Sequence, residues 1–156
     1  MNNLVCYYSL EGNTDFVARK IAEKTNAELL EVKPVNELDG QSFKKYLIGG
    51  FQSIVRYRPD LQEHNFSDDT YDHLFLGSPV WAGSITPPIR SFLHNNSLNA
   101  DKIVLFSTYQ SSKGKVFDQM KQFIDQNKVV DEIGFSQVLN DKEKNLEILD
   151  NRISGL

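Results

Sequence analysis

The sequence predicts an α/β protein in which a parallel sheet is covered by helices on both sides. Short apolar runs recur along the chain and alternate with segments whose apolar residues have helical spacing. Within the runs, apolar residues stand at consecutive positions rather than at every second one, which is typical of strands buried on both faces. A length of 156 residues, 40% of them hydrophobic and 24% charged, predicts one domain over residues 1–156 with one well-buried core.

Five apolar runs are expected to form strands. They are Leu4–Tyr8, Leu29–Val32, His73–Leu76, Ile103–Phe106 and Val129–Val138. Helical spacing connects the apolar residues in four other segments, which are Phe16–Ala22, Ile89–Leu93, Val116–Ile124 and the final segment Lys142–Ile153. The stretch 42–61 is also amphipathic, with Phe43, Leu47 and Phe51 able to face the sheet. Its basic residues indicate a solvated face, or a surface for a partner or a second subunit.

Charge and cysteine content exclude several classes of function. A formal net charge of -4 and a pI near 5.4 argue against a nucleic-acid or anionic-membrane partner. Cys6 is the only cysteine, so a disulfide framework and a metal cluster built on thiolates are excluded. The three histidines show no metal-ligand spacing. Without a signal-peptide pattern or a run long enough to span a bilayer, we expect a cytoplasmic protein.

The stretch from Ser9 to Thr14 follows the first expected strand and precedes a helix expected to begin near Asp15. Asn13 or Thr14 could cap that helix. A helix N-terminus offers unpaired N–H groups and the positive end of the dipole, and Gly12 lets a ligand approach the backbone. The alternative is a plain strand-to-helix turn. Neither the phosphate-loop pattern of nucleoside triphosphatases nor the dinucleotide-binding G-x-G-x-x-G is present.

Two further unusual loops follow the third and fourth expected strands, at the edge of the sheet where open α/β sheets bind ligands. Residues 77–88 contain the only tryptophan, Trp81, in a loop between Pro79 and Gly83. It suits the stacking of a planar ligand, although packing under the loop is the alternative. Residues 107–115 contain Tyr109 and a small polar run, which alone could be a solvated turn. Together the three loops predict a site for a phosphorylated planar ring.

The stretches S-L-E-G-N-T, G-S-P-V-W-A-G and S-T-Y-Q-S-S-K-G-K resemble, in order, the three FMN-binding loops of the flavodoxin-like family. The resemblance covers essentially the whole chain. It implies a three-layer αβα sandwich with a five-stranded parallel sheet in the order 2-1-3-4-5, and FMN as the cofactor. The cofactor-binding residues it implies are Ser9, Leu10, Glu11, Gly12, Asn13, Thr14, Pro79, Val80, Trp81, Ala82, Gly83, Thr108, Tyr109, Gln110, Lys113 and Gly114.

The resemblance also implies roles within the site. The family's first-loop pattern carries over onto Ser9, Gly12, Asn13 and Thr14, but Glu11 stands where the family often has a hydroxyl, and a carboxylate there repels phosphate unless it points to solvent. Trp81 would lie against the isoalloxazine, with Tyr109 as the candidate for its opposite face. Lys113 would be the nearest cation to the pyrimidine side of the flavin and would tune its potential.

No side chain has the setting of a nucleophile or general base, so FMN itself would carry the chemistry. Two functions stay open: an electron carrier between redox partner proteins, and an NAD(P)H-dependent flavin or quinone oxidoreductase. A third is a non-redox binder of a phosphorylated ligand on the same fold. The missing nicotinamide pocket argues against the enzyme, and the modest net charge argues against a steered carrier. The balance favours the carrier; the oligomeric state stays open.

Overall fold

Five parallel strands form the centre of the molecule. The computed structural model describes residues 1–37 and 57–156. The strands are β1 (Asn3–Tyr7), β2 (Glu28–Glu31), β3 (Tyr71–Trp81), β5 (Ala100–Tyr109) and β6 (Val129–Ser136). Their order across the sheet is β2-β1-β3-β5-β6, and every neighbouring pair is parallel. A two-residue strand, β4 (Ser84–Ile85), pairs antiparallel with the end of β3. Apart from the numbering shift caused by β4, the expected order 2-1-3-4-5 is confirmed.

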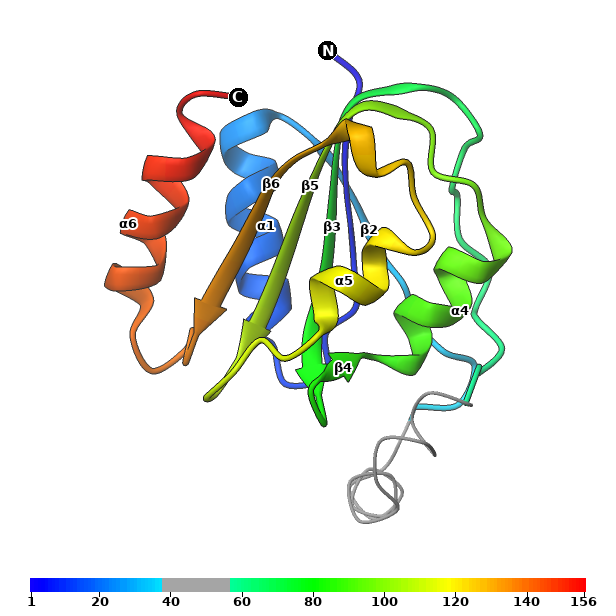
Figure 1. Cartoon of the computed structure of the whole chain (residues 1–156), viewed down its shortest axis with the longest axis horizontal. Coiled ribbons are helices and arrows are strands. Elements are labelled where there is room, and N and C mark those ends of the chain that lie inside the picture. The colour runs from blue at the N-terminus through cyan, green and yellow to red at the C-terminus, as the bar shows by residue number, and fades with distance from the viewer. Residues whose placement is uncertain (38–56) are drawn as a thin grey trace.

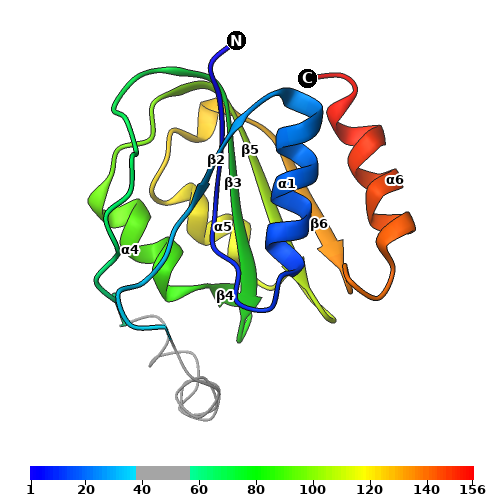
Figure 2. The ribbon, with the colours of Figure 1, turned by 180° about the vertical axis from the view of Figure 1, so that it is seen from behind.

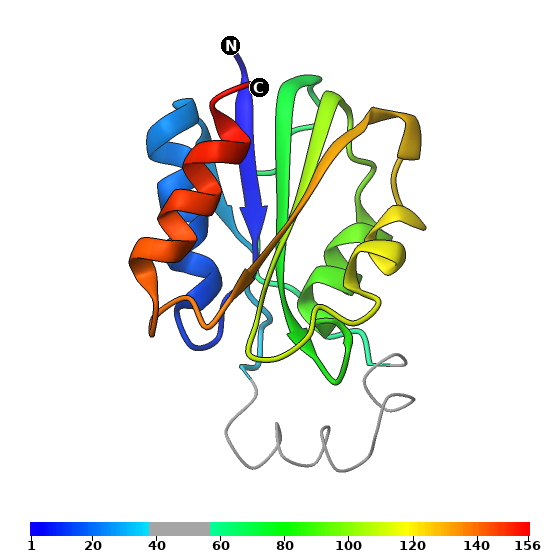
Figure 3. The same ribbon diagram turned by 60° about the vertical axis from the view of Figure 1, so that its left-hand side comes forward.

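Helices cover both faces of this sheet (Figure 1). Figure 3 shows the layers side by side, with α1 (Asn13–Thr25) and α6 (Lys142–Ile153) on one face and α4 (Pro87–Asn95) and α5 (Val116–Lys121) on the other. The view from behind shows α1 and α6 beside each other (Figure 2). A single 3-10 turn over Gln126–Lys128 leads into β6. The three-layer αβα arrangement is therefore confirmed.

The hydrophobic core has two parts because consecutive strand residues point to opposite faces of the sheet. Val5 and Tyr7 of β1 pack with α1 and α6, whereas Leu4 and Cys6 pack on the side of α4 and α5. Cys6 is completely buried, and this burial raises the pKa of its thiol. Strands with both faces covered explain why the apolar runs of the sequence do not alternate.

Several elements differ from the expected boundaries. β3 is an eleven-residue strand rather than four residues long, because it continues through small and polar residues to Trp81. α5 ends at Lys121, so Phe123 and Ile124 lie beyond it, although both still pack against the core. Of the amphipathic stretch 42–61, residues 42–56 lie outside the described residues. Within residues 1–37 and 57–156, no helix is long and apolar enough to cross a membrane.

Close packing between β3 and β5 leaves no room for a side chain at Gly77. A Cβ added at Gly77 would lie 2.1 Å from Cζ of Phe106, its partner in the register of the two strands. We expect Gly77→Ala to lower the free energy of unfolding by about 1 to 3 kcal/mol, the usual cost of overpacking a core. Urea denaturation measures this loss. In a Phe106→Leu background the same substitution should cost less, because the smaller side chain leaves room; a cost that is equal in both backgrounds would contradict the explanation.

Candidate functional site

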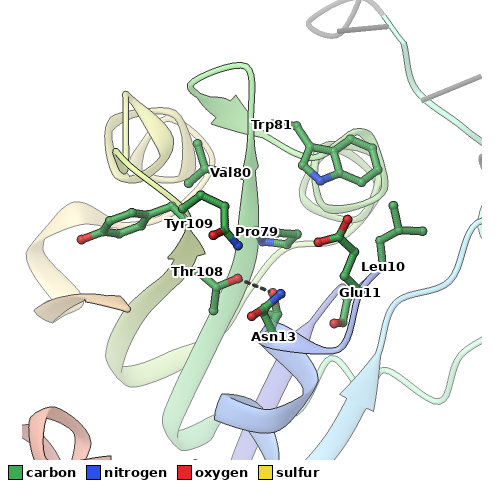
Figure 4. Close-up of a pocket in the computed structure, with 11 residues that line it drawn as sticks. Leu10, Glu11, Asn13, Pro79, Val80, Trp81, Thr108 and Tyr109 are labelled. Atoms are coloured by element: carbon green, nitrogen blue, oxygen red, sulfur yellow. Dashed lines mark hydrogen bonds between the residues drawn. The ribbon is translucent and has the colours of Figure 1, made fainter. Parts of the chain in front are cut away.

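The loops that follow β1, β3 and β5 meet at one edge of the sheet and enclose a cleft of about 240 Å³ (Figure 4). These strands are neighbours and run parallel, so their carboxyl ends lie together. The residues that line the cleft are Ser9, Leu10, Glu11, Asn13, Thr14, Pro79, Val80, Trp81, Thr108, Tyr109 and Gln110. All of them belong to the set predicted from the sequence. Gly12, Ala82, Gly83, Lys113 and Gly114 were also predicted, but do not line the cleft.

The first loop turns sharply into α1. The helix begins at Asn13, with Gly12 as its N-cap at a φ of 92° and no side-chain capping bond. The expectation of a start near Asp15, capped by Asn13 or Thr14, is therefore wrong. The glycine takes a left-handed conformation that other residues rarely adopt, and its N–H donates to Ser9 Oγ at 3.2 Å. The first intrahelical bond is donated by Phe16 N–H to Gly12 O, so the preceding amides of the first turn have no helical acceptor.

The side chains of Asn13 and Thr14 are held in place by other loops. Thr14 is 1% exposed, and its Oγ1 lies 2.8 Å from Oγ1 of Thr108 at the end of β5. Asn13 Oδ1 accepts a hydrogen bond from the backbone N–H of Leu139, in the loop after β6, at 3.2 Å. With the carboxamide oxygen engaged in this way, the Asn13 nitrogen is the end left to donate to a ligand. Sequence reasoning did not anticipate Leu139.

Trp81 stands at the end of a strand rather than in a loop, so that expectation is wrong. Ala82 and Gly83 form a two-residue turn with positive φ angles of 49° and 73°, which folds β4 back onto β3. Positive φ at both positions matches the twist of an antiparallel hairpin. The indole is 6% exposed and meets the Tyr8 ring edge-to-face, with the ring centroids 5.7 Å apart. It packs against the core and lines the cleft at the same time.

The hairpin that carries Trp81 is anchored by polar side chains from two helices. Gln119 Oε1 of α5 accepts hydrogen bonds from Ser84 Oγ and Ile85 N–H, both at 2.8 Å. Arg90 of α4 donates to Ser84 Oγ at 3.0 Å. Arg90 is 5% exposed, and burial lowers the pKa of its guanidinium. Neither Gln119 nor Arg90 has a sequence signal of its own, because each looks like an ordinary polar helix residue.

Gly83, in the turn after β3, packs closely against Gly114, in the loop after β5. Gly114 has a φ of 53°, and a Cβ added there would lie 2.5 Å from the carbonyl oxygen of Gly83. That oxygen accepts a hydrogen bond from Lys115 N–H at 2.9 Å. Gly83 and Gly114 therefore shape the loops behind the cleft instead of lining it.

Two predicted residues are directed away from the centre of the cleft. Lys113 is exposed, and its Nζ lies 5.6 Å from the ring centroid of Phe117, so the structure does not place it as a cation on the cleft. The Tyr109 ring lies over Gly134 of β6, whose added Cβ would come within 2.9 Å of the phenolic oxygen. Figure 4 shows this ring pointing away from Trp81. Tyr109 thus lines the cleft without forming a wall opposite the indole.

A buried tyrosine positions the first turn of α1. The hydroxyl of Tyr7, at the end of β1, donates to Asp15 Oδ1 at 2.6 Å, and Arg19 forms an ion pair with the same carboxylate at 2.9 Å. Burial alone would raise the pKa of Asp15, but the hydrogen bonds from Arg19 and Tyr7 outweigh it and hold this pKa below its usual value. The hydrogen bond between Tyr7 and Asp15 therefore joins the end of β1 to the first turn of α1 and fixes the loop between them.

Tyr7→Phe tests this anchor. We expect the free energy of unfolding at neutral pH to fall by about 1 to 2 kcal/mol, because the bond to a carboxylate is lost. A lowered Asp15 pKa stabilises the fold above the ordinary aspartate pKa of about 3.9, and this stabilisation is lost as the pH falls through the folded value. The difference between the two proteins should therefore shrink below about pH 4. Tyr8→Phe is the control, since the Tyr8 hydroxyl makes only a 3.3 Å contact with Glu37; an equal loss in both variants would contradict the assignment.

Comparisons with known proteins agree with this fold. No curated protein matches the chain. A solved structure from Bacteroides eggerthii DSM 20697, regarded as a flavoprotein, is 21% identical with a TM-score of 0.70, and the match covers 96% of each chain. A flavoprotein from Lactobacillus acidophilus NCFM in complex with FMN is 22% identical with a TM-score of 0.64, covering 90% of this chain and 97% of that one. The chain also matches the flavodoxin family over residues 2–148. It therefore belongs to the flavodoxin family.

Proposed function

We propose that the chain binds FMN in the cleft and carries electrons between redox partner proteins. The observation that carries this proposal is that the N-terminus of α1 and the indole of Trp81 lie on one cleft, so that a phosphate and a planar ring could bind together. Membership of the flavodoxin family supports FMN as the ligand, as does the shared fold of the Lactobacillus acidophilus protein in complex with FMN.

The phosphate of FMN would bind at the first turn of α1. The donors there are backbone N–H groups without helical acceptors, the Asn13 carboxamide nitrogen and the hydroxyls of Ser9 and Thr14. The positive end of the helix dipole favours an anion at this position. Because Thr14 is held by Thr108 and Asn13 by Leu139, the side-chain donors are oriented before the ligand arrives. Such preorganisation lowers the entropic cost of binding.

The ring would lie at the end of the cleft formed by Trp81, Pro79 and Val80. Bound FMN supplies the redox chemistry, while the chain provides position and surroundings. The hairpin anchored by Gln119 and Arg90 holds the indole, so the ring would meet a preformed wall. Most of the lining near the ring is apolar or small, which excludes water from one face of a planar ligand.

The dimensions and charges of the cleft favour a carrier over a hydride-accepting enzyme. At about 240 Å³ the cleft is smaller than typical small-molecule sites of roughly 300 to 1,000 Å³, so part of FMN would remain at the surface, within reach of a partner. Among the described residues, no lysine or arginine lines the cleft to hold the phosphates of NAD(P)H. These features support electron exchange with a docked protein.

FMN binding can be followed through Trp81, since it is the only tryptophan. We expect FMN to quench its emission and to bind more tightly than riboflavin. Replacing Asn13 and Thr14 together by alanine should weaken FMN at least about tenfold, because one or two hydrogen bonds to a charged group, each worth roughly 1.5 to 3 kcal/mol, are lost. Riboflavin affinity, measured by its own fluorescence, is the control and should change little. Unchanged tryptophan emission on addition of FMN would place the ring elsewhere.

Anaerobic reduction of the FMN complex distinguishes the candidate functions. We expect dithionite to reduce the bound flavin fully, whereas NADH and NADPH should reduce it no faster than they reduce free FMN, because the described lining offers no cation for their phosphates. Absorbance spectra in a stopped-flow instrument record both reactions. Rapid reduction by either nucleotide would favour the NAD(P)H-dependent oxidoreductase instead. A bound flavin that dithionite does not reduce would favour a non-redox binder.

A further inference from the structure

The described lining of the cleft offers no cation to a phosphate. Of its lining residues within the described part of the chain, Glu11 is the one that carries a charge, and that charge is negative. Anion sites commonly place an arginine or lysine beside the phosphate. Here amides, hydroxyls and the helix dipole would attract a phosphate, whereas the carboxylate of Glu11 would repel it.

Among the described residues, nothing forms an ion pair with Glu11. The residue is exposed. It directly precedes Gly12, the N-cap of α1, so it lies within the Ser9–Thr14 stretch that is proposed to hold the phosphate. In Figure 4 its carboxylate extends toward Trp81 and lies on the cleft side of the loop. At low ionic strength the Debye length exceeds about 10 Å, so salt screens Glu11 little from an anion bound in the same cleft.

From this arrangement we infer that Glu11 is a specificity-determining residue that opposes the phosphate of the ligand. The inference rests on the proposed FMN function and deepens it. Repulsion by Glu11 acts on FMN, which carries a phosphate dianion, and spares riboflavin, which has the same ring and ribityl chain without the phosphate. Glu11 thereby reduces the factor by which the cleft binds FMN more tightly than riboflavin, whereas the donors at the start of α1 increase it.

Repulsion between Glu11 and the phosphate determines how the affinity for FMN depends on salt concentration. A phosphate site built on cations loses affinity as salt is raised, because screening weakens the attraction. In this cleft the one charged residue of the described lining, Glu11, repels a phosphate, so screening should leave FMN affinity unchanged or increase it. Exposed charges more distant than a Debye length of about 10 Å at 0.1 M salt contribute little to the effect.

Glu11→Gln tests the inference, with Glu147→Gln as a matched control. Gln keeps the size of the side chain and removes its charge. Glu147 is an exposed residue of α6 that does not line the cleft, so its replacement changes the net charge of the protein equally. The dissociation constants of FMN and riboflavin are measured by fluorescence titration for all three proteins at low and high ionic strength.

We expect Glu11→Gln to tighten FMN binding on the order of threefold to tenfold at low salt, the range for a carboxylate and a phosphate separated by water. The gain should diminish at high salt, and it should be absent for riboflavin and for Glu147→Gln. Weaker binding of both flavins by Glu11→Gln would overturn the inference, since Glu11 would then accept a hydrogen bond from the ring or ribityl chain. An unchanged FMN affinity would overturn it as well, while leaving the proposed function intact. If FMN binds none of the three proteins, the proposed function fails and this inference fails with it.

Discussion

The position of the first turn of α1 is the constraint on which the site depends. Tyr7 at the end of β1 holds Asp15, and Thr108 near the end of β5 holds Thr14. Between these anchors, Gly12 takes the left-handed conformation that lets the chain turn from strand to helix within a few residues. These contacts fix the position of the first-turn amides that lack helical acceptors, so the phosphate site proposed there would depend on the way in which the helix is attached to the sheet.

Much of this arrangement was accessible from the sequence because it is local. The stretches around Ser9, Trp81 and Tyr109 each lie at the carboxyl end of a strand, and parallel strands bring their carboxyl ends together whatever the other details of the fold. The family resemblance supplied the individual residues, and all residues found to line the cleft belong to the set that it implied. The strand order was predicted through the family resemblance, and the short β4 changed only its numbering.

The features that the sequence did not reveal depend on contacts between distant segments. Trp81 was assigned to a loop because Gly83 and Pro79 break the pattern of a strand, yet Gln119 and Arg90 hold it at the end of a hairpin. The Tyr109 ring lies over Gly134 on the adjacent strand because this glycine has no side chain to block it. The contact of Lys113 with the Phe117 ring was not foreseen either, while its place near bound flavin stays a prediction. The orientation of such a side chain depends on the residue that it packs against. When that residue is distant in the sequence, no local sequence pattern indicates the contact.

The described lining of the cleft combines neutral donors with one carboxylate, Glu11, and this combination would affect the reduction potential of the proposed FMN as well as its affinity. A neighbouring negative charge disfavours the ionised form of a group, so Glu11 would oppose any negative charge that the ring acquires on reduction, in the same way that it opposes the phosphate. Because Lys113 is directed toward Phe117, the described lining offers no cation to offset this effect. The potential of bound FMN would then be set by Glu11 together with the backbone donors of the loops, and one residue beside Gly12 would influence both the retention of the cofactor and the ease of its reduction.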